Sequence, residues 1–129
     1  PDTTVAPQSE GDAVAAYLQT NGLAGTKTQT NLYYEIVEPG TGGAPNSCSV
    51  VQISYRGTLT NGHEFDKSDN LVYNLNRLIK GWIQGLPLIQ KGGRIKLYIP
   101  PTLAYGSQPI GDIPANSILI FDITLINFQ

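Results

Sequence analysis

The 129-residue chain has no methionine, one cysteine and one histidine, and only 14% of its residues are charged. Cys48 alone can form neither an internal disulfide nor, without clustered histidines, a zinc site. No segment approaches the roughly 20 apolar residues that span a bilayer, so no membrane span is expected. The net charge of −2 provides no basic surface, which makes nucleic acid an unexpected partner.

Side chains for acid/base or nucleophilic chemistry are also scarce. The only histidine, His63, lies beside an Asn-Gly pair, where a solvated turn residue is the favoured interpretation. The carboxylates are scattered, with no Glu-x-x-His or Asp-x-Asp spacing. Conventional hydrolysis is therefore poorly supported. No metal and no cofactor is expected.

The N-terminal quarter predicts an appendage. The absence of methionine and the start at Pro1 predict a processed or trimmed part of a longer precursor. Residues 1–8 indicate a flexible leader, and Ser9 predicts a helix N-cap with Asp12 as its acidic partner. Asn21-Gly22 ends this short helix. The apolar stripe of the helix consists of Val14, Tyr17 and Leu18.

The remaining chain has the alternation of β-strands. Apolar and polar side chains alternate around residues 32–36, 51–56 and 94–99. Residues 118–128 are apolar on both faces, as a central covered strand would be. Asn61-Gly62 predicts a type I′ turn that joins residues 50–59 to residues 63–66.

One core helix is visible between Leu78 and Leu86, and its Gly81 and Gly85 would permit close approach of another backbone. The predicted fold class is α+β: a twisted antiparallel β-sheet wrapped over a single short core helix, with a small N-terminal helix appended. Residues 1–31 form the predicted leader and helix, and residues 32–129 the predicted main domain.

The residues that point to a binding function are aromatic. Tyr55, Phe65, Trp82, Tyr105 and Phe121 fall on different predicted elements, and one concave pocket could collect them. Each of these residues alone is more often plain core. The pattern by itself therefore leaves core and pocket wall as open alternatives.

Residues 32–129 contain eight short motifs, in this order: Val51-Gln52-Ile53-Ser54-Tyr55-Arg56-Gly57, Asn61-Gly62-His63-Glu64-Phe65-Asp66, Leu78-Ile79-Lys80-Gly81-Trp82, Lys91-Gly92-Gly93, Ile99-Pro100-Pro101, Leu103-Ala104-Tyr105-Gly106, Ile113-Pro114-Ala115-Asn116-Ser117 and Leu119-Ile120-Phe121. In these motifs and their order the chain resembles the FKBP-type peptidyl-prolyl cis-trans isomerases.

The resemblance implies a site for a proline ring. Trp82 would form its floor, and the Ile79 amide and the Tyr105 hydroxyl would bond the carbonyls that flank the ring. Asp66 would lie at the edge, and Tyr73 and Leu75 would support the site from the core. The implied catalytic residues are Phe65, Asp66, Ile79 and Tyr105. The implied substrate-binding residues are Tyr55, Phe65, Asp66, Leu71, Leu78, Ile79, Trp82, Tyr105, Ile113 and Phe121.

Three departures from the family pattern affect this site. The segment between Asp66 and Tyr73 is short, so the arginine that often pairs with the aspartate has no clear counterpart. Leu71 stands where a pocket aromatic is usual. Asp112 stands where an isoleucine often precedes the Ile-Pro pair.

By resemblance, the chain is an isomerase that rotates X-Pro bonds in folding proteins by desolvation and hydrogen bonding. The alternatives are a non-catalytic module that binds proline segments or acts as a chaperone, and a structural domain whose aromatics are closed core. The implied partners are proline-containing polypeptides and macrolide inhibitors of the tacrolimus or rapamycin type. The short helix lacks coiled-coil heptads, so a monomer is expected.

The N-terminal lead-in resembles that of exported bacterial family members. It favours the bacterial cell envelope or periplasm as the location, with a lipoprotein before processing as one form. The alternative location is the cytoplasm.

Overall fold

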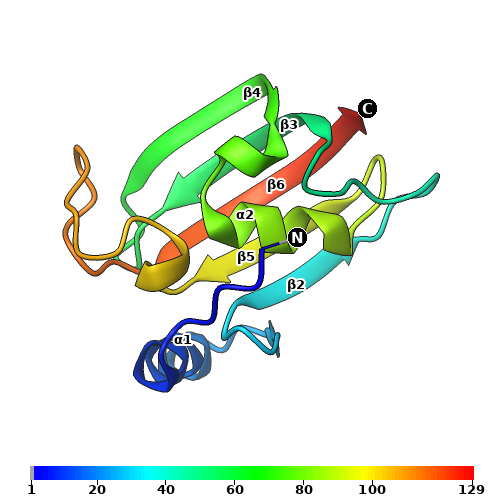
Figure 1. The fold of residues 1–129 in the computed structure, drawn as a ribbon. Coiled ribbons are helices and arrows are strands. Elements are labelled where there is room, and N and C mark those ends of the chain that lie inside the picture. Colours follow the sequence, from blue (N-terminus) through cyan, green and yellow to red (C-terminus); the bar gives the residue numbers. More distant parts are fainter. Residues whose placement is uncertain (1) are drawn as a thin grey trace.

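A computed structural model describes residues 2–129 and arranges them as a β-sheet with helices on both of its faces (Figure 1). The elements run in the order α1 (Gln8–Thr20), β1 (Thr26–Lys27), β2 (Tyr33–Glu38), β3 (Val50–Thr58), β4 (Glu64–Asn74), the 3-10 turn η1 (Leu75–Arg77), α2 (Lys80–Gly85), the 3-10 turn η2 (Leu86–Leu88), β5 (Arg94–Ile99), the 3-10 turn η3 (Pro101–Leu103) and β6 (Leu119–Phe128).

The sheet is antiparallel throughout, with six strands in the order β1-β2-β5-β6-β3-β4. β6 lies at its centre between β5 and β3, as its apolar sequence predicted. Alternate residues of β6 are fully or almost fully buried, from Leu119 to Leu125. The predicted α+β class, with a sheet over one short core helix, is therefore confirmed.

Helix α2 lies across one face of the sheet (Figure 1) and approaches β5 closely because two of its residues are glycine. A Cβ added at Gly81 would lie 2.6 Å from Ile99 Cδ1, and one at Gly85 would lie 2.6 Å from Leu97 Cδ2. The predicted close approach is confirmed, but the atoms that the helix backbone approaches belong to the side chains of Ile99 and Leu97 and not to another backbone. This approach fixes the depth of the helix over the sheet. The main core lies between them and includes Val51, Ile53, Leu75, Trp82, Leu86, Ile95, Leu97, Ile99, Leu119, Phe121 and Ile123.

Helix α1 is held against a second apolar cluster. Its buried Val14 and Leu18 pack with Tyr98, which follows Leu97 on β5 and therefore points to the opposite face of the sheet from α2. The predicted cap is wrong: Ser9 lies inside the helix, Pro7 occupies the N-cap position, and no side-chain bond caps the end. Proline has no N–H and a fixed φ, so it suits a helix start without side-chain capping.

Residues 2–7 pack against the body, which corrects the prediction of a flexible leader. Ala6 is 2% exposed, its N–H donates to the Thr30 carbonyl, and its carbonyl accepts from Asn31 Nδ2. Gln84 Nε2 on α2 donates to Asp2 Oδ1 and to the Thr4 carbonyl. One buried alanine, one backbone bond and the polar side chains of Asn31 and Gln84 supply these contacts, so hydrophobic periodicity could not reveal them. The division at residue 31 stays a prediction.

The loop between β3 and β4 differs from the predicted type I′ turn. That turn needs positive φ at both central residues, and of the Asn61-Gly62 pair only Gly62, at 88°, has it. The Gly62 N–H donates to the Leu59 carbonyl, and the Leu59 N–H donates to the His63 carbonyl. The result is a three-residue loop that ends in a left-handed glycine. The following strand runs from Glu64 to Asn74, longer than the predicted 63–66.

Candidate active site

A hollow opens between α2, β4 and the segment after η3. Its volume is about 90 Å³, well above the roughly 10–15 Å³ that one water molecule needs. Eight of the ten predicted substrate-binding residues line it: Tyr55, Asp66, Leu71, Leu78, Ile79, Trp82, Tyr105 and Phe121. The structure therefore brings together side chains from three strands, one helix and two loops.

Four aromatic rings pack together here: three of them line the hollow, and the fourth, Phe65, packs against Phe121. Phe121 is the centre of the group: its ring centroid lies 4.9 Å from that of Trp82 and 5.5 Å from that of Phe65, with interplanar angles of 90° and 88°. Tyr55 stands edge-on to Trp82 at 5.0 Å. Edge-to-face pairs of this kind contribute about 0.5–1.5 kcal/mol each beyond area burial, so the group forms a rigid surface.

Trp82 is 4% exposed, as a floor residue should be. Within residues 2–129 its Nε1 is buried without a hydrogen-bond partner. An unsatisfied buried donor costs roughly 1–3 kcal/mol. Trp82 therefore gives the hollow an apolar floor, and its unpaired Nε1–H lowers the stability of the fold.

Asp66 is fixed at the edge of the hollow by a tyrosine. The Tyr55 hydroxyl donates to Asp66 Oδ2 at 2.7 Å. Burial raises the pKa of Tyr55 above its ordinary value of 10, and the bond to the Asp66 carboxylate raises it further. Tyr55 therefore remains a protonated donor to the Asp66 carboxylate at neutral pH.

Two donors face the rim. Tyr105 is 38% exposed, and burial of its hydroxyl, with the nearby Asp66 charge, raises its pKa. Ile79 is the N-cap of α2 with extended backbone, and no acceptor for its N–H is found within residues 2–129. A helix N-cap leaves such amides available to an incoming carbonyl.

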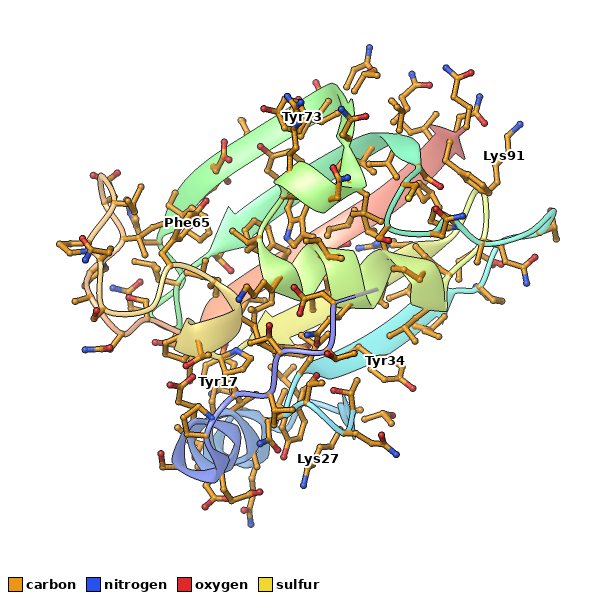
Figure 2. All side chains as sticks on the ribbon, in the orientation of Figure 1. Tyr17, Lys27, Tyr34, Phe65, Tyr73 and Lys91 are labelled. Carbon is orange, nitrogen blue, oxygen red and sulfur yellow. The ribbon has the colours of Figure 1, made fainter. Side chains whose placement is uncertain are left out.

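Three expected residues lie elsewhere. Phe65 does not line the hollow; its ring packs behind Phe121. Ile113 is 6% exposed and belongs to the main core, where its bridge to Ile110 turns it inward, so it is not at the rim. Tyr73 is 44% exposed on the edge strand β4 (Figure 2), which corrects its predicted core position, whereas Leu75 is fully buried.

Gly57 was missed by the sequence interpretation although it shapes the site. It lies on β3 beneath the Phe65–Phe121 pair, and an added Cβ would be 2.7 Å from an atom of each ring. A glycine inside a strand signals a close approach of this kind, but the sequence does not say which side chain approaches.

The remaining polar groups stay outside the hollow. His63 Nε2 and Asp112 Oδ2 lie 3.3 Å apart with both side chains largely exposed, so the pair links the β3–β4 loop to the segment around residue 112. No three histidine, cysteine or acidic side chains gather at a metal-binding distance anywhere between residues 2 and 129. No helix in the same range is long and apolar enough to cross a membrane.

The fold and the hollow together define a class of protein: a small α+β domain with an aromatic-walled hollow between its helix and its sheet. A family model described as FKBP-type peptidyl-prolyl cis-trans isomerase matches residues 42–126. The chain belongs to this family, which confirms the predicted family.

Individual relatives support the assignment. The FKBP-type peptidyl-prolyl cis-trans isomerase FkpA of Escherichia coli is 47% identical over 110 residues, which is 81% of this chain and 41% of the relative. A crystal structure of FkpA from the same organism superposes with a TM-score of 0.85 at 38% identity and covers 95% of this chain and 60% of the other. A peptidyl-prolyl isomerase structure from Pseudomonas syringae gives 0.81 at 28% identity and covers 98% of each chain. The chain thus spans about two fifths of the length of its FkpA relative.

Proposed function

We propose that this chain catalyses rotation about X-Pro bonds in polypeptides and that the hollow between α2 and β4 receives the proline ring. The observation that carries the proposal is the convergence of eight of the ten predicted residues on one apolar hollow. The proposed catalytic residues are Phe65, Asp66, Ile79 and Tyr105, with Phe65 acting from behind the wall. The catalytic unit is residues 32–129.

The mechanism needs no nucleophile. Rotation of the amide loses resonance across a barrier of roughly 18–20 kcal/mol, and water opposes that loss by solvating the planar, polarised form. The aromatic hollow withdraws this solvation. The Ile79 N–H and the Tyr105 hydroxyl donate to the carbonyls on either side of the ring, and they do so best in the twisted geometry. Asp66, oriented by Tyr55, faces the substrate backbone.

The test is isomerisation of a short Ala-Leu-Pro-Phe peptide by the wild-type protein and by Phe65→Ala. His63→Ala is the control, because its side chain is exposed and does not line the hollow. The proposal expects strong acceleration by wild type and His63→Ala, and a large loss in folded Phe65→Ala. No acceleration by folded wild-type protein would overturn it.

A second candidate is a binding module in which turnover is incidental, as in a chaperone. Leu71 favours it, because a leucine lines the hollow where the resembled family usually has an aromatic ring. A smaller wall could hold proline segments without enforcing the twisted geometry. This candidate predicts measurable binding of a proline peptide by calorimetry with no acceleration. Leu71→Phe should then raise turnover.

We further propose that a tacrolimus-type macrolide occupies the same hollow, that the chain is a monomer and that it works in the bacterial cell envelope or periplasm. The aromatic floor supports the first proposal, and the packing of α1 onto its own sheet supports the second. Competition by the macrolide in the peptide assay, light scattering after size exclusion, and cell fractionation test them in turn. A cytoplasmic location, or a lipid-anchored precursor, would appear in the last experiment.

A further inference from the structure

One contact joins the N-terminal helix to the segment that carries Tyr105. Glu10, in the first turn of α1, accepts two hydrogen bonds from Thr102: the backbone N–H donates to Oε1 at 2.8 Å, and the side-chain hydroxyl donates to Oε2 at 2.7 Å. Both bonds are partly buried, and the two residues are 92 positions apart in the sequence. Bonds to a charged carboxylate are among the stronger hydrogen bonds in proteins.

Thr102 is the middle residue of η3, three residues before Tyr105. The other amides of this turn are satisfied locally, because Leu103 donates to the Pro100 carbonyl and Ala104 to the Pro101 carbonyl. The Thr102 N–H lies too early in the turn for such a partner. Glu10 therefore completes the turn from outside, from an element that contributes no side chain to the hollow.

We propose that Glu10 is a positioning residue for the isomerase reaction: through Thr102 it fixes η3 and thereby the place of the Tyr105 hydroxyl at the rim. In Figure 1 α1 lies directly beside the yellow-orange turn of η3. The inference rests on the proposed function, in which the Tyr105 hydroxyl bonds the substrate. It adds that residues before 32 tune the site.

The contact is not needed to dock the helix. Val14 and Leu18 anchor α1 on Tyr98, and Asn31 and Gln84 hold the preceding segment. Loss of the Glu10 carboxylate should therefore leave α1 in place and release η3 alone. Loss of the Glu10 carboxylate should therefore lower kcat and should change the free energy of unfolding only slightly.

The experiment is a double-substitution cycle on the full chain. Glu10→Ala removes both hydrogen bonds, and Thr102→Val removes the hydroxyl bond but keeps the backbone bond. Tyr105→Phe removes the group that the contact is proposed to position. Peptide isomerisation gives kcat and KM for each variant, and urea unfolding confirms that each is folded under assay conditions. Asp12→Ala is the matched control, because it removes an exposed carboxylate of the same helix whose bond is only to Gln8.

We expect Glu10→Ala to lower kcat about five- to tenfold, and Thr102→Val, which loses one of the two bonds, to lower kcat about two- to fivefold. KM should be nearly unchanged in both, since misplacement of one contact group acts on the transition state. In the Tyr105→Phe background the same substitutions should change kcat by less than about twofold, which is the signature of coupling. Glu10→Gln retains an acceptor and should restore most of the activity. Asp12→Ala should match wild type.

A second readout does not depend on activity. With ¹³C-labelled tyrosine, the Tyr105 ring signal should shift in Glu10→Ala and Thr102→Val and stay in place in Asp12→Ala. An active wild type with equal losses from Glu10→Ala in both backgrounds, or an unmoved Tyr105 signal, would overturn the positioning role alone. An inactive wild type would overturn the proposed function, and the ring signal would still decide the position of Tyr105.

Discussion

A single methyl group added at Gly57 should displace the Phe65 and Phe121 rings and so change the shape of the hollow. Gly57 lies on β3 under the edges of Phe65 and Phe121, and the Cβ of Gly57→Ala would be 2.7 Å from Phe121 Cε1 and 2.7 Å from Phe65 Cζ. Both rings belong to the interlocked aromatic group that includes Trp82. Because these rings pack edge to face, neither can retreat without moving a neighbour.

The size of the effect follows from the overlap. Ordinary contact begins at 3.4 Å, so the rings must withdraw by about 0.7 Å, and such overpacking typically costs 1–3 kcal/mol. Replacing glycine within a strand returns roughly 0.5–1 kcal/mol of chain entropy. We therefore expect Gly57→Ala to lower the free energy of unfolding by about 0.5–2 kcal/mol. A shift of Phe121 at the floor should lower kcat/KM at least about tenfold.

The assays are urea unfolding and peptide isomerisation at a temperature where the variant is fully folded. Ser54→Ala is the control, because it changes a residue on the opposite face of the same strand. Adding Phe65→Leu to Gly57→Ala should recover part of the stability, since the smaller side chain relieves the overlap. If Gly57→Ala keeps both wild-type stability and wild-type turnover, the rings do not pack over Gly57 as described.

Three further outcomes are expected. Tyr55→Phe should lower kcat/KM several-fold while changing the unfolding free energy by only about 1 kcal/mol; unchanged turnover would mean that the orientation of Asp66 is irrelevant. Gly81→Ala, whose Cβ would lie 2.6 Å from a β5 side chain, should destabilise the fold by about 1–3 kcal/mol in urea, and an unchanged midpoint would contradict the tight packing of α2. Hydrogen bonds from Arg94 lower the pKa of Asp122 from its ordinary 3.8, so the pair should stabilise the fold above that pH and lose this effect as the pH falls through the lowered pKa. Asp122→Asn should remove this part of the acid dependence, and an identical acid profile would refute it.

The strands and the core helix were predictable because their signals are local. Alternation placed β3 and β5, the apolar run 118–128 indicated the central strand β6, and Gly81 with Gly85 indicated a helix pressed onto a neighbouring element. The errors came where polar contacts decide the outcome. Pro7 replaced Ser9 as the N-cap, and residues 2–7 pack on the body through bonds to Asn31 and Gln84.

The site was predictable to the extent that the family motifs carry it, because spacing alone left core and pocket wall undecided. The motifs identified the eight residues that line the hollow. They did not predict how deeply Ile113 and Tyr73 are buried. Ile113 turned into the core, and Tyr73 lies exposed on β4, which is the last strand at one edge of the sheet that residues 2–129 form. The bond from Tyr55 to Asp66 could not be read from the sequence, since it joins side chains on two strands whose register is shifted.

Contacts from residues that do not line the hollow also decide where the catalytic unit begins. The position of a residue that lines the hollow depends on the residues that pack against it from the other side. Here these residues are distant in the sequence: Gly57 packs against Phe121, and Glu10 binds Thr102 in the turn before Tyr105. A chain that starts after residue 31 would keep every residue that lines the hollow but would lose the contact between Glu10 and Thr102. If Glu10 positions Tyr105, such a fragment should lose at least as much turnover as Glu10→Ala, because it also loses the packing of Ala6, Val14 and Leu18 on the body.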